Sequence, residues 1–151
     1  MGEHLVEILL VEDNPNDAEL SLYALKKHRI ANRVHHSRDG AEAMDYLFGE
    51  GTYAGRNVEE TPKVVLLDLK LPKVDGLEVL KRIKSDPRTR QIPVVVLTSS
   101  REEKDILESY NLGVNSYIVK PIDFELFSES VRQLGYYWVL INESPVSKLD
   151  Y

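Results

Sequence analysis

Residues 63–76 read KVVLLDLKLPKVDG, and this stretch decides the fold class of the chain. Within it, Val64–Leu67 form a continuous apolar run rich in β-branched residues and bounded by Pro62 and Pro72, which is typical of a strand buried on both faces. Asp68 follows that run directly. Open α/β sheets hold their ligands outside the carboxyl ends of the strands, so Asp68 stands either at a ligand site or simply at the start of a turn.

The alternation of a buried strand with an amphipathic helix occurs five times along the chain. Besides residues 64–67, the expected strands cover residues 6–11, 32–37, 94–97 and 117–119. The first helix is expected to begin at Pro15, with Asn14 as its cap, and to end near His28. Apolar residues at helical spacing mark the helices: Ala18, Leu22 and Leu25; Ala43, Met44 and Leu47; Leu77, Leu80 and Ile83; Ile106, Leu107 and Tyr110; Phe124, Phe127, Val131 and Leu134. This order predicts one doubly wound α/β domain with a five-stranded parallel sheet and helices on both faces.

Composition limits the function classes that need to be considered. A length of 151 residues fits one domain, and neither a 20-residue apolar run nor a signal peptide is present, so we expect a cytoplasmic protein without a membrane partner. The absence of cysteine excludes disulfides, thiolate metal sites and cysteine nucleophiles. A net charge of −6 argues against nucleic acid as a direct partner.

Polar side chains stand at the carboxyl ends of four expected strands. They are Glu12 and Asp13, Asp68, Thr98 and Lys120. Because these ends share one rim of a parallel sheet, we expect the side chains to gather in one pocket. Three crowded carboxylates repel one another, and a hard divalent cation such as Mg²⁺ relieves that repulsion, while Lys120 supplies further positive charge.

This set of residues suits phosphoryl transfer. An aspartate can attack a phosphoryl group and form an acyl phosphate when a metal and a lysine neutralise the developing charge, and Asp68 is the expected acceptor. Thr98 offers a hydroxyl that could swing to a phosphoryl oxygen and move its loop between two states. Tyr117, three residues before Lys120, could change rotamer with it.

On these motifs, residues 6–134 resemble the receiver domain of two-component response regulators. The matching residues are Glu12, Asp13, Asp68 within LLDLKLPKVDG, Thr98, Tyr117 and Lys120 followed by Pro121. The resemblance implies a flavodoxin-like (βα)5 fold and a receiver domain at residues 1–136. It also implies a signalling phosphoacceptor rather than an enzyme with an external product, catalysing only its own phosphorylation and dephosphorylation.

The resemblance further implies roles for the pocket residues. A sensor histidine kinase would donate the phosphoryl group to Asp68, with Mg²⁺ held by Asp13, Asp68 and the backbone carbonyl of Lys70. Glu12 would act on the metal mostly through water. The peptide bond between Lys120 and Pro121 would be cis. Ser99 departs from the pattern, because many receivers have alanine after the switch hydroxyl.

A narrower resemblance links the chain to the single-domain response regulators that partner bacterial phytochromes. It rests on the long connection at residues 49–62, on DYLFGEG at residues 45–51 and on YYWVL at residues 136–140. The long connection is either a recognition loop or a tolerated insertion. The aromatic and polar tail at residues 137–151 either packs on its own domain or lies at a dimer interface. We expect a symmetric homodimer through the fourth helix, the fifth strand, the fifth helix and this tail.

Three other functions fit the sequence less well than a receiver does. A haloacid-dehalogenase-type phosphatase needs a second aspartate two residues after the nucleophile, where this chain has Lys70. A receiver-like binding module that works without phosphorylation would not need the full set of pocket residues. A flavin or dinucleotide site would want a glycine-rich turn after the first strand, where residues 12–17 read EDNPND. The four histidines show no metal-binding spacing and are expected to be surface or structural residues.

Overall fold

A computed structural model describes residues 7–27 and 33–121, together with residues 123, 125–127, 129 and 133. Its five strands form one parallel sheet in the order β2-β1-β3-β4-β5. The strands are β1 Glu7–Val11, β2 Arg33–Ser37, β3 Val64–Leu67, β4 Val94–Thr98 and β5 Ser116–Val119. The predicted flavodoxin-like fold class is confirmed.

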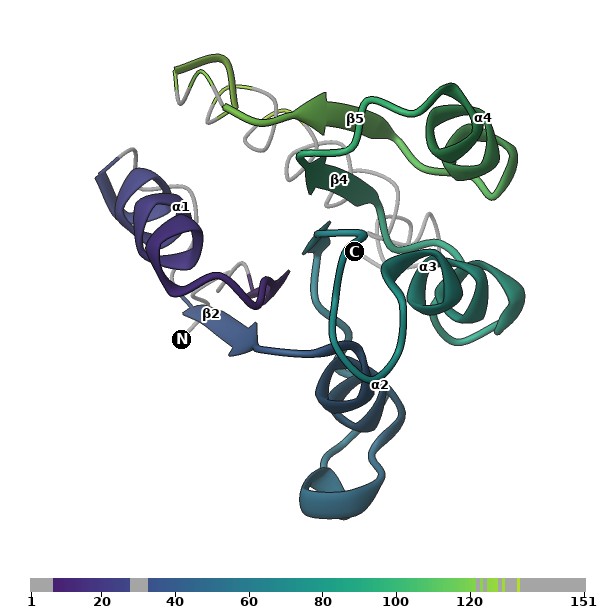
Figure 1. Ribbon diagram of the computed structural model, residues 1–151. Coiled ribbons are helices and arrows are strands. Elements are labelled where there is room, and N and C mark those ends of the chain that lie inside the picture. Colours follow the sequence, from purple (N-terminus) through teal and green to yellow (C-terminus); the bar gives the residue numbers. More distant parts are fainter. Residues whose placement is uncertain are drawn as a thin grey trace, which may run out of the picture.

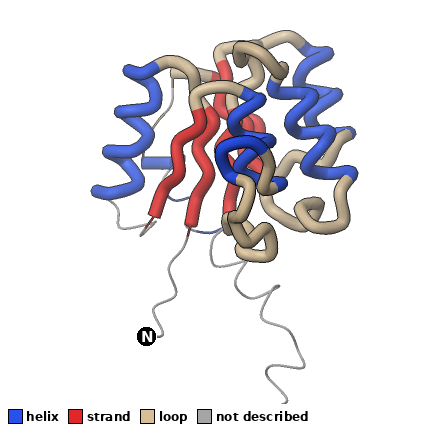
Figure 2. Tube along the Cα trace, turned by 90° about the horizontal axis from the view of Figure 1, so that it is seen from below, coloured by secondary structure: helices blue, strands red, loops and turns tan. Residues whose placement is uncertain are grey.

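Helices cover both faces of the sheet. They are α1 Pro15–Lys27, α2 Gly40–Phe48, α3 Gly76–Ser85 and α4 Glu103–Asn111. In Figure 1, α1 lies on the opposite side of the sheet from α2, α3 and α4, and Figure 2 shows the strands side by side between these helices. Residues 125–127, 129 and 133 are also helical, and the Asp123 carboxylate caps them by accepting the amide N–H of Glu125 at 3.1 Å. The predicted end of the first helix near His28, the start of the strand at Val6 and the tail at 137–151 lie outside the described residues.

Strand side chains alternate between two hydrophobic cores. Leu9 and Val11 of β1 pack with α2 and α3, while Ile8 and Leu10 pack with α1. All four residues of β3 are fully buried, two in each core. Burial on both faces explains why residues 64–67 read as an unbroken apolar run rather than as an alternating one.

The parallel register brings the strand ends to one rim. Val11 of β1 pairs with Leu67 of β3, and Thr98 of β4 pairs with Val119 of β5. Two residues that follow these strands are tied to a neighbouring strand end. The amide N–H of Asp68 donates to the carbonyl of Val11 at 3.0 Å. In the same way, the amide of Lys120 donates to the carbonyl of Thr98 at 2.8 Å.

The connection at residues 49–62, which we call the anchored loop, includes a short 3₁₀ helix at Gly51–Tyr53. Arg56 fastens it to α2: its guanidinium lies 4.0 Å from the centre of the Tyr46 ring and donates to the carbonyls of Tyr46 at 2.9 Å and Glu60 at 2.6 Å. His35 of β2 stacks on Tyr46 with ring centres 3.9 Å apart. The loop therefore has a defined attachment at the end of the sheet where β3 begins.

Candidate functional site

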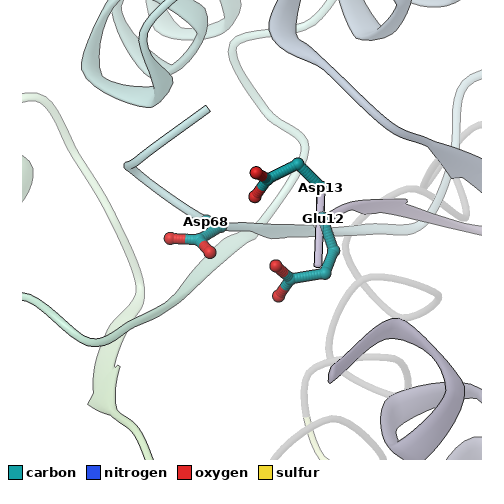
Figure 3. A group of neighbouring side chains, drawn as sticks. All are labelled: Glu12, Asp13 and Asp68. Atoms are coloured by element: carbon teal, nitrogen blue, oxygen red, sulfur yellow. The ribbon is translucent and has the colours of Figure 1, made fainter. Parts of the chain in front are cut away.

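Three carboxylates meet where β1 and β3 end. One oxygen from each of Glu12, Asp13 and Asp68 lies within 4.8 Å of the others. Figure 3 shows the three side chains directed into the same space, with Glu12 and Asp13 coming from the end of β1 and Asp68 from the end of β3. Glu12 and Asp68 are buried, whereas Asp13 is exposed and opens the cluster to solvent.

Lys120 enters this cluster from the end of β5. Its Nζ donates to Glu12 Oε1 at 2.9 Å and to Asp68 Oδ2 at 3.1 Å. It also donates to Asp17 Oδ2 at 2.8 Å, from the first turn of α1. Asp17 carries no signal of a pocket residue in the sequence, because an acid in the first turn of a helix is already explained by the helix dipole.

Burial and hydrogen bonding act against each other in the pocket. Burial raises the pKa of Glu12 to about 7, although the hydrogen bond from Lys120 opposes this rise and the Asp68 charge adds to it. Burial alone would lower the pKa of Lys120, but hydrogen bonds to Asp17 and Glu12 outweigh it and raise that pKa above its usual value. Lys120 is therefore cationic at neutral pH, whereas the raised pKa of Glu12 lies close to neutral pH.

The backbone around Asp68 is held closely. The amide N–H of Lys70 donates to Asp68 Oδ1 at 3.2 Å, so the carboxylate has a partner on each oxygen. Gly76 begins α3 directly against this turn, and a Cβ at this position would come within 2.3 Å of the Asp68 carbonyl oxygen. The glycine in the KVDG stretch is thus required by the close approach of α3 to the site.

Ser100 links the two predicted switch residues to α4. Its amide N–H donates to Thr98 Oγ1 at 3.3 Å, and its carbonyl accepts the Tyr117 hydroxyl at 3.1 Å. Its own hydroxyl donates to Asp105 Oδ2 in α4 at 2.6 Å. The Ser100 hydroxyl also accepts the amide N–H of Glu102 at 3.3 Å, so a movement of the Thr98 hydroxyl would release one of four hydrogen bonds made by this buried residue.

Two further features complete the rim. The Lys120–Pro121 peptide bond is cis. His36, which sequence analysis assigned a surface or structural role, has its Nε2 at 2.8 Å from the Glu12 carbonyl oxygen and so ties β2 to the acidic turn. The other histidine on β2, His35, packs in the aromatic group beneath the anchored loop.

The donor set fits a hard divalent cation. Carboxylate oxygens, one of them exposed, are the ligands that Mg²⁺ prefers, and an open cluster leaves room for the waters that Mg²⁺ retains. A single ammonium cannot neutralise the carboxylates around it, so a dication would relieve their mutual repulsion.

These features define a class of protein. The family model described as "Response regulator receiver domain" matches residues 8–132, and the chain belongs to this family. Receiver domains are signalling phosphoacceptors, and the acidic pocket of this chain is of the kind that such a site requires.

The proteins to which this chain is similar include response regulators of bacterial phytochromes. The structure of the bacteriophytochrome response regulator AtBRR is 56% identical, with a TM-score of 0.77, and the match covers 93% of this chain and 100% of that one. The response regulator Rcp1 of Synechocystis sp. (strain ATCC 27184 / PCC 6803 / Kazusa) is 41% identical over 87% of this chain and 88% of its own length. The structure of its Mn²⁺-bound form has a TM-score of 0.74, covering 87% of this chain and 93% of that one. The probable methanogenesis regulatory protein FilR2 of Methanothrix harundinacea (strain 6Ac) is 47% identical over 91% of this chain and 86% of its own length.

Proposed function

We propose that this chain is a stand-alone phosphorylation switch in which Asp68 accepts a phosphoryl group from a phosphohistidine of a sensor kinase. The observation that carries the proposal is the Lys120 ammonium, which pairs with Glu12 and Asp68 although it lies 108 and 52 residues away from them in sequence. A structural ion pair would need one carboxylate. Lys120 lies among several carboxylates, and carboxylates alone would repel a phosphoryl group. Its ammonium is therefore suited to holding a phosphoryl oxygen.

The proposed transfer is an in-line displacement at phosphorus. An Asp68 carboxylate oxygen forms the new O–P bond, and the P–N bond to the donor imidazole breaks, leaving its electron pair on nitrogen. Mg²⁺, when bound, would neutralise charge on the phosphoryl oxygens. Asp13, Asp68 and the Lys70 carbonyl would hold it, with Glu12 acting through water. Rcp1, a relative with a similar chain, has a structure in a Mn²⁺-bound form, which supports a divalent metal here.

The proposed signal leaves through β4 and β5. When the Thr98 hydroxyl turns to the new phosphoryl group, it gives up the Ser100 amide, and Tyr117 loses a fixed partner as Ser100 moves. We place the output on α4, β5, the fifth helix and the tail at residues 137–151, where a second copy would bind. Exposed Leu107 and Tyr110 on α4 support an apolar interface there.

The proposed kinase partner is a bacterial phytochrome. AtBRR supports this, since it is named as a bacteriophytochrome response regulator. FilR2, however, is named for methanogenesis, so the kinase has to be tested directly.

We propose the cytoplasm as the location. Within residues 7–27 and 33–121 and the few others described, no helix is long and apolar enough to cross a membrane.

Intact mass after incubation with acetyl phosphate and Mg²⁺ tests the proposal. We expect a gain of one phosphoryl group that disappears with a chelator and in Asp68→Asn, which keeps the shape of the side chain. The oligomeric state of the same samples shows whether phosphorylation drives dimerisation. Labelling that persists in Asp68→Asn would contradict the assignment, and no labelling by either acetyl phosphate or a phosphorylated phytochrome kinase would favour a binding module that works unphosphorylated.

A further inference from the structure

We infer that Asp17 is a positioning residue that competes with the phosphoryl group for the Lys120 ammonium. The inference rests on the proposed function. It begins from the shortest ion pair of Lys120, which joins its Nζ to Asp17 Oδ2 at 2.8 Å across 103 residues of sequence. Asp17 is placed for this contact by the start of α1, where its amide N–H donates to Asn14 Oδ1 at 3.0 Å.

An ammonium group has three N–H donors, and here carboxylates occupy all of them. A phosphoryl oxygen on Asp68 can bind Lys120 only if one of these hydrogen bonds is exchanged. Because the ammonium is held between α1 and the strand ends, part of its charge faces Asp17 and not the place where the phosphoryl group arrives.

The three carboxylates differ in what their release costs. The side chains of Glu12 and Asp68 are 3% and 8% exposed, whereas that of Asp17 is 37% exposed. A buried carboxylate that loses its partner carries a large desolvation cost, but water can replace Lys120 at an exposed one. Asp17 is therefore the partner that Lys120 gives up most readily.

Charge acts in the same direction as geometry. Asp17 adds a fourth carboxylate to those of Glu12, Asp13 and Asp68. Its negative charge attracts a divalent cation and repels a phosphoryl dianion. Neutralising Asp17 should therefore weaken metal binding and, once metal is saturating, speed phosphoryl uptake. General damage to the fold would lower both.

Asp17→Asn and two control variants separate these readings. Asp17→Glu keeps the charge, and Glu19→Gln removes an exposed acid from the same helix that does not pair with Lys120 in the described part of the chain. Mn²⁺ affinity is measured by electron paramagnetic resonance without phosphodonor. Uptake from acetyl phosphate at saturating Mg²⁺ is followed by intact mass, as an Asp68 oxygen forms its bond to phosphorus and acetate leaves with the electron pair.

We expect Asp17→Asn to bind Mn²⁺ about two- to fivefold more weakly and to take up phosphate about two- to fivefold faster, the range for a partly exposed ion pair. Asp17→Glu and Glu19→Gln should stay near the wild type in both. An unchanged Mn²⁺ affinity, or slower uptake at saturating metal, would overturn the inference. If the wild-type protein takes up a phosphoryl group neither from acetyl phosphate nor from a phosphorylated phytochrome kinase, the proposed function fails, and the inference is then judged on Mn²⁺ affinity alone.

Discussion

Replacing Ser100 by alanine should destabilise the protein through Asp105. The Asp105 side chain is 5% exposed, and the Ser100 hydroxyl donates to it at 2.6 Å. Lys70 lies 3.7 Å from the same oxygen, but its side chain is 62% exposed, so water screens that pair. Ser100→Ala therefore leaves a buried carboxylate without its closest donor.

The cost of a buried acceptor that loses its donor is about 1–3 kcal/mol, and the screened Lys70 pair offsets less than about 1 kcal/mol of it. We expect the free energy of unfolding to fall by about 2 kcal/mol. For a chain of this length that is a drop of roughly 4–8 °C in Tm.

Urea unfolding of the metal-free protein measures this change, with equal m values required for the comparison. Ser85→Ala is the control, because the Ser85 hydroxyl donates to the Arg82 carbonyl at 3.3 Å in an exposed position of α3. Its loss should stay within about 0.5 kcal/mol. In an Asp105→Asn background, Ser100→Ala should cost less, since a neutral amide is cheaper to bury. If Ser100→Ala were as mild as Ser85→Ala, the hydroxyl would not be supporting the buried carboxylate and this reasoning would be refuted.

Two further predictions concern the acidic pocket. Burial raises the pKa of Glu12 from 4.5 to about 7, so the native state holds this proton more tightly than the unfolded chain. The resulting stability is complete below pH 4.5 and is lost as pH rises through about 7. Glu12→Gln should remove a fall of roughly 1–3 kcal/mol between about pH 5 and pH 8, measured by urea unfolding in chelator, and parallel pH profiles would contradict this. Gly76→Ala forces a Cβ to within 2.3 Å of the Asp68 carbonyl oxygen, so we expect a loss of about 1–3 kcal/mol and slower phosphoryl uptake. Ser85→Ala in the same helix is the control for that variant, and wild-type uptake by Gly76→Ala would show that α3 can move away from the site.

The sheet could be predicted because its central strands are buried on both faces. The expected strand at residues 64–67 is β3 without any change of boundary. The prediction ends the next strand at Leu97, whereas β4 continues to Thr98, because that residue still pairs with Val119 while its hydroxyl faces Ser100. A polar residue at a strand end carries no apolar signal by which sequence could include it.

The pocket could be predicted only as far as strand ends define it. Glu12, Asp13, Asp68 and Lys120 follow buried runs, so topology alone brings them together. Asp17 was missed because its role depends on how α1 is turned toward β5, which hydrophobic spacing does not specify. The bond between Ser100 and Asp105 was missed for a similar reason, since it depends on where a loop places one hydroxyl.

The anchored loop leads into the amino end of β3, whereas the acidic pocket lies at the carboxyl end of that strand. Arg56 donates to the carbonyl of Tyr46 in α2 and to the carbonyl of Glu60 in the loop. The loop leads into the first residue of β3, at the opposite end of this strand from Asp68. Gly55 in this loop has a φ of +108°, which disfavours any residue with a side chain, although a Cβ there would meet no atom within 4 Å. The loop therefore has room for an insertion next to Gly55, as long as the glycine itself is kept, while Arg56 holds the attachment fixed. Lineages that share one chemistry could thus acquire different partners, and an engineer could use this loop to redirect the switch without redesigning it.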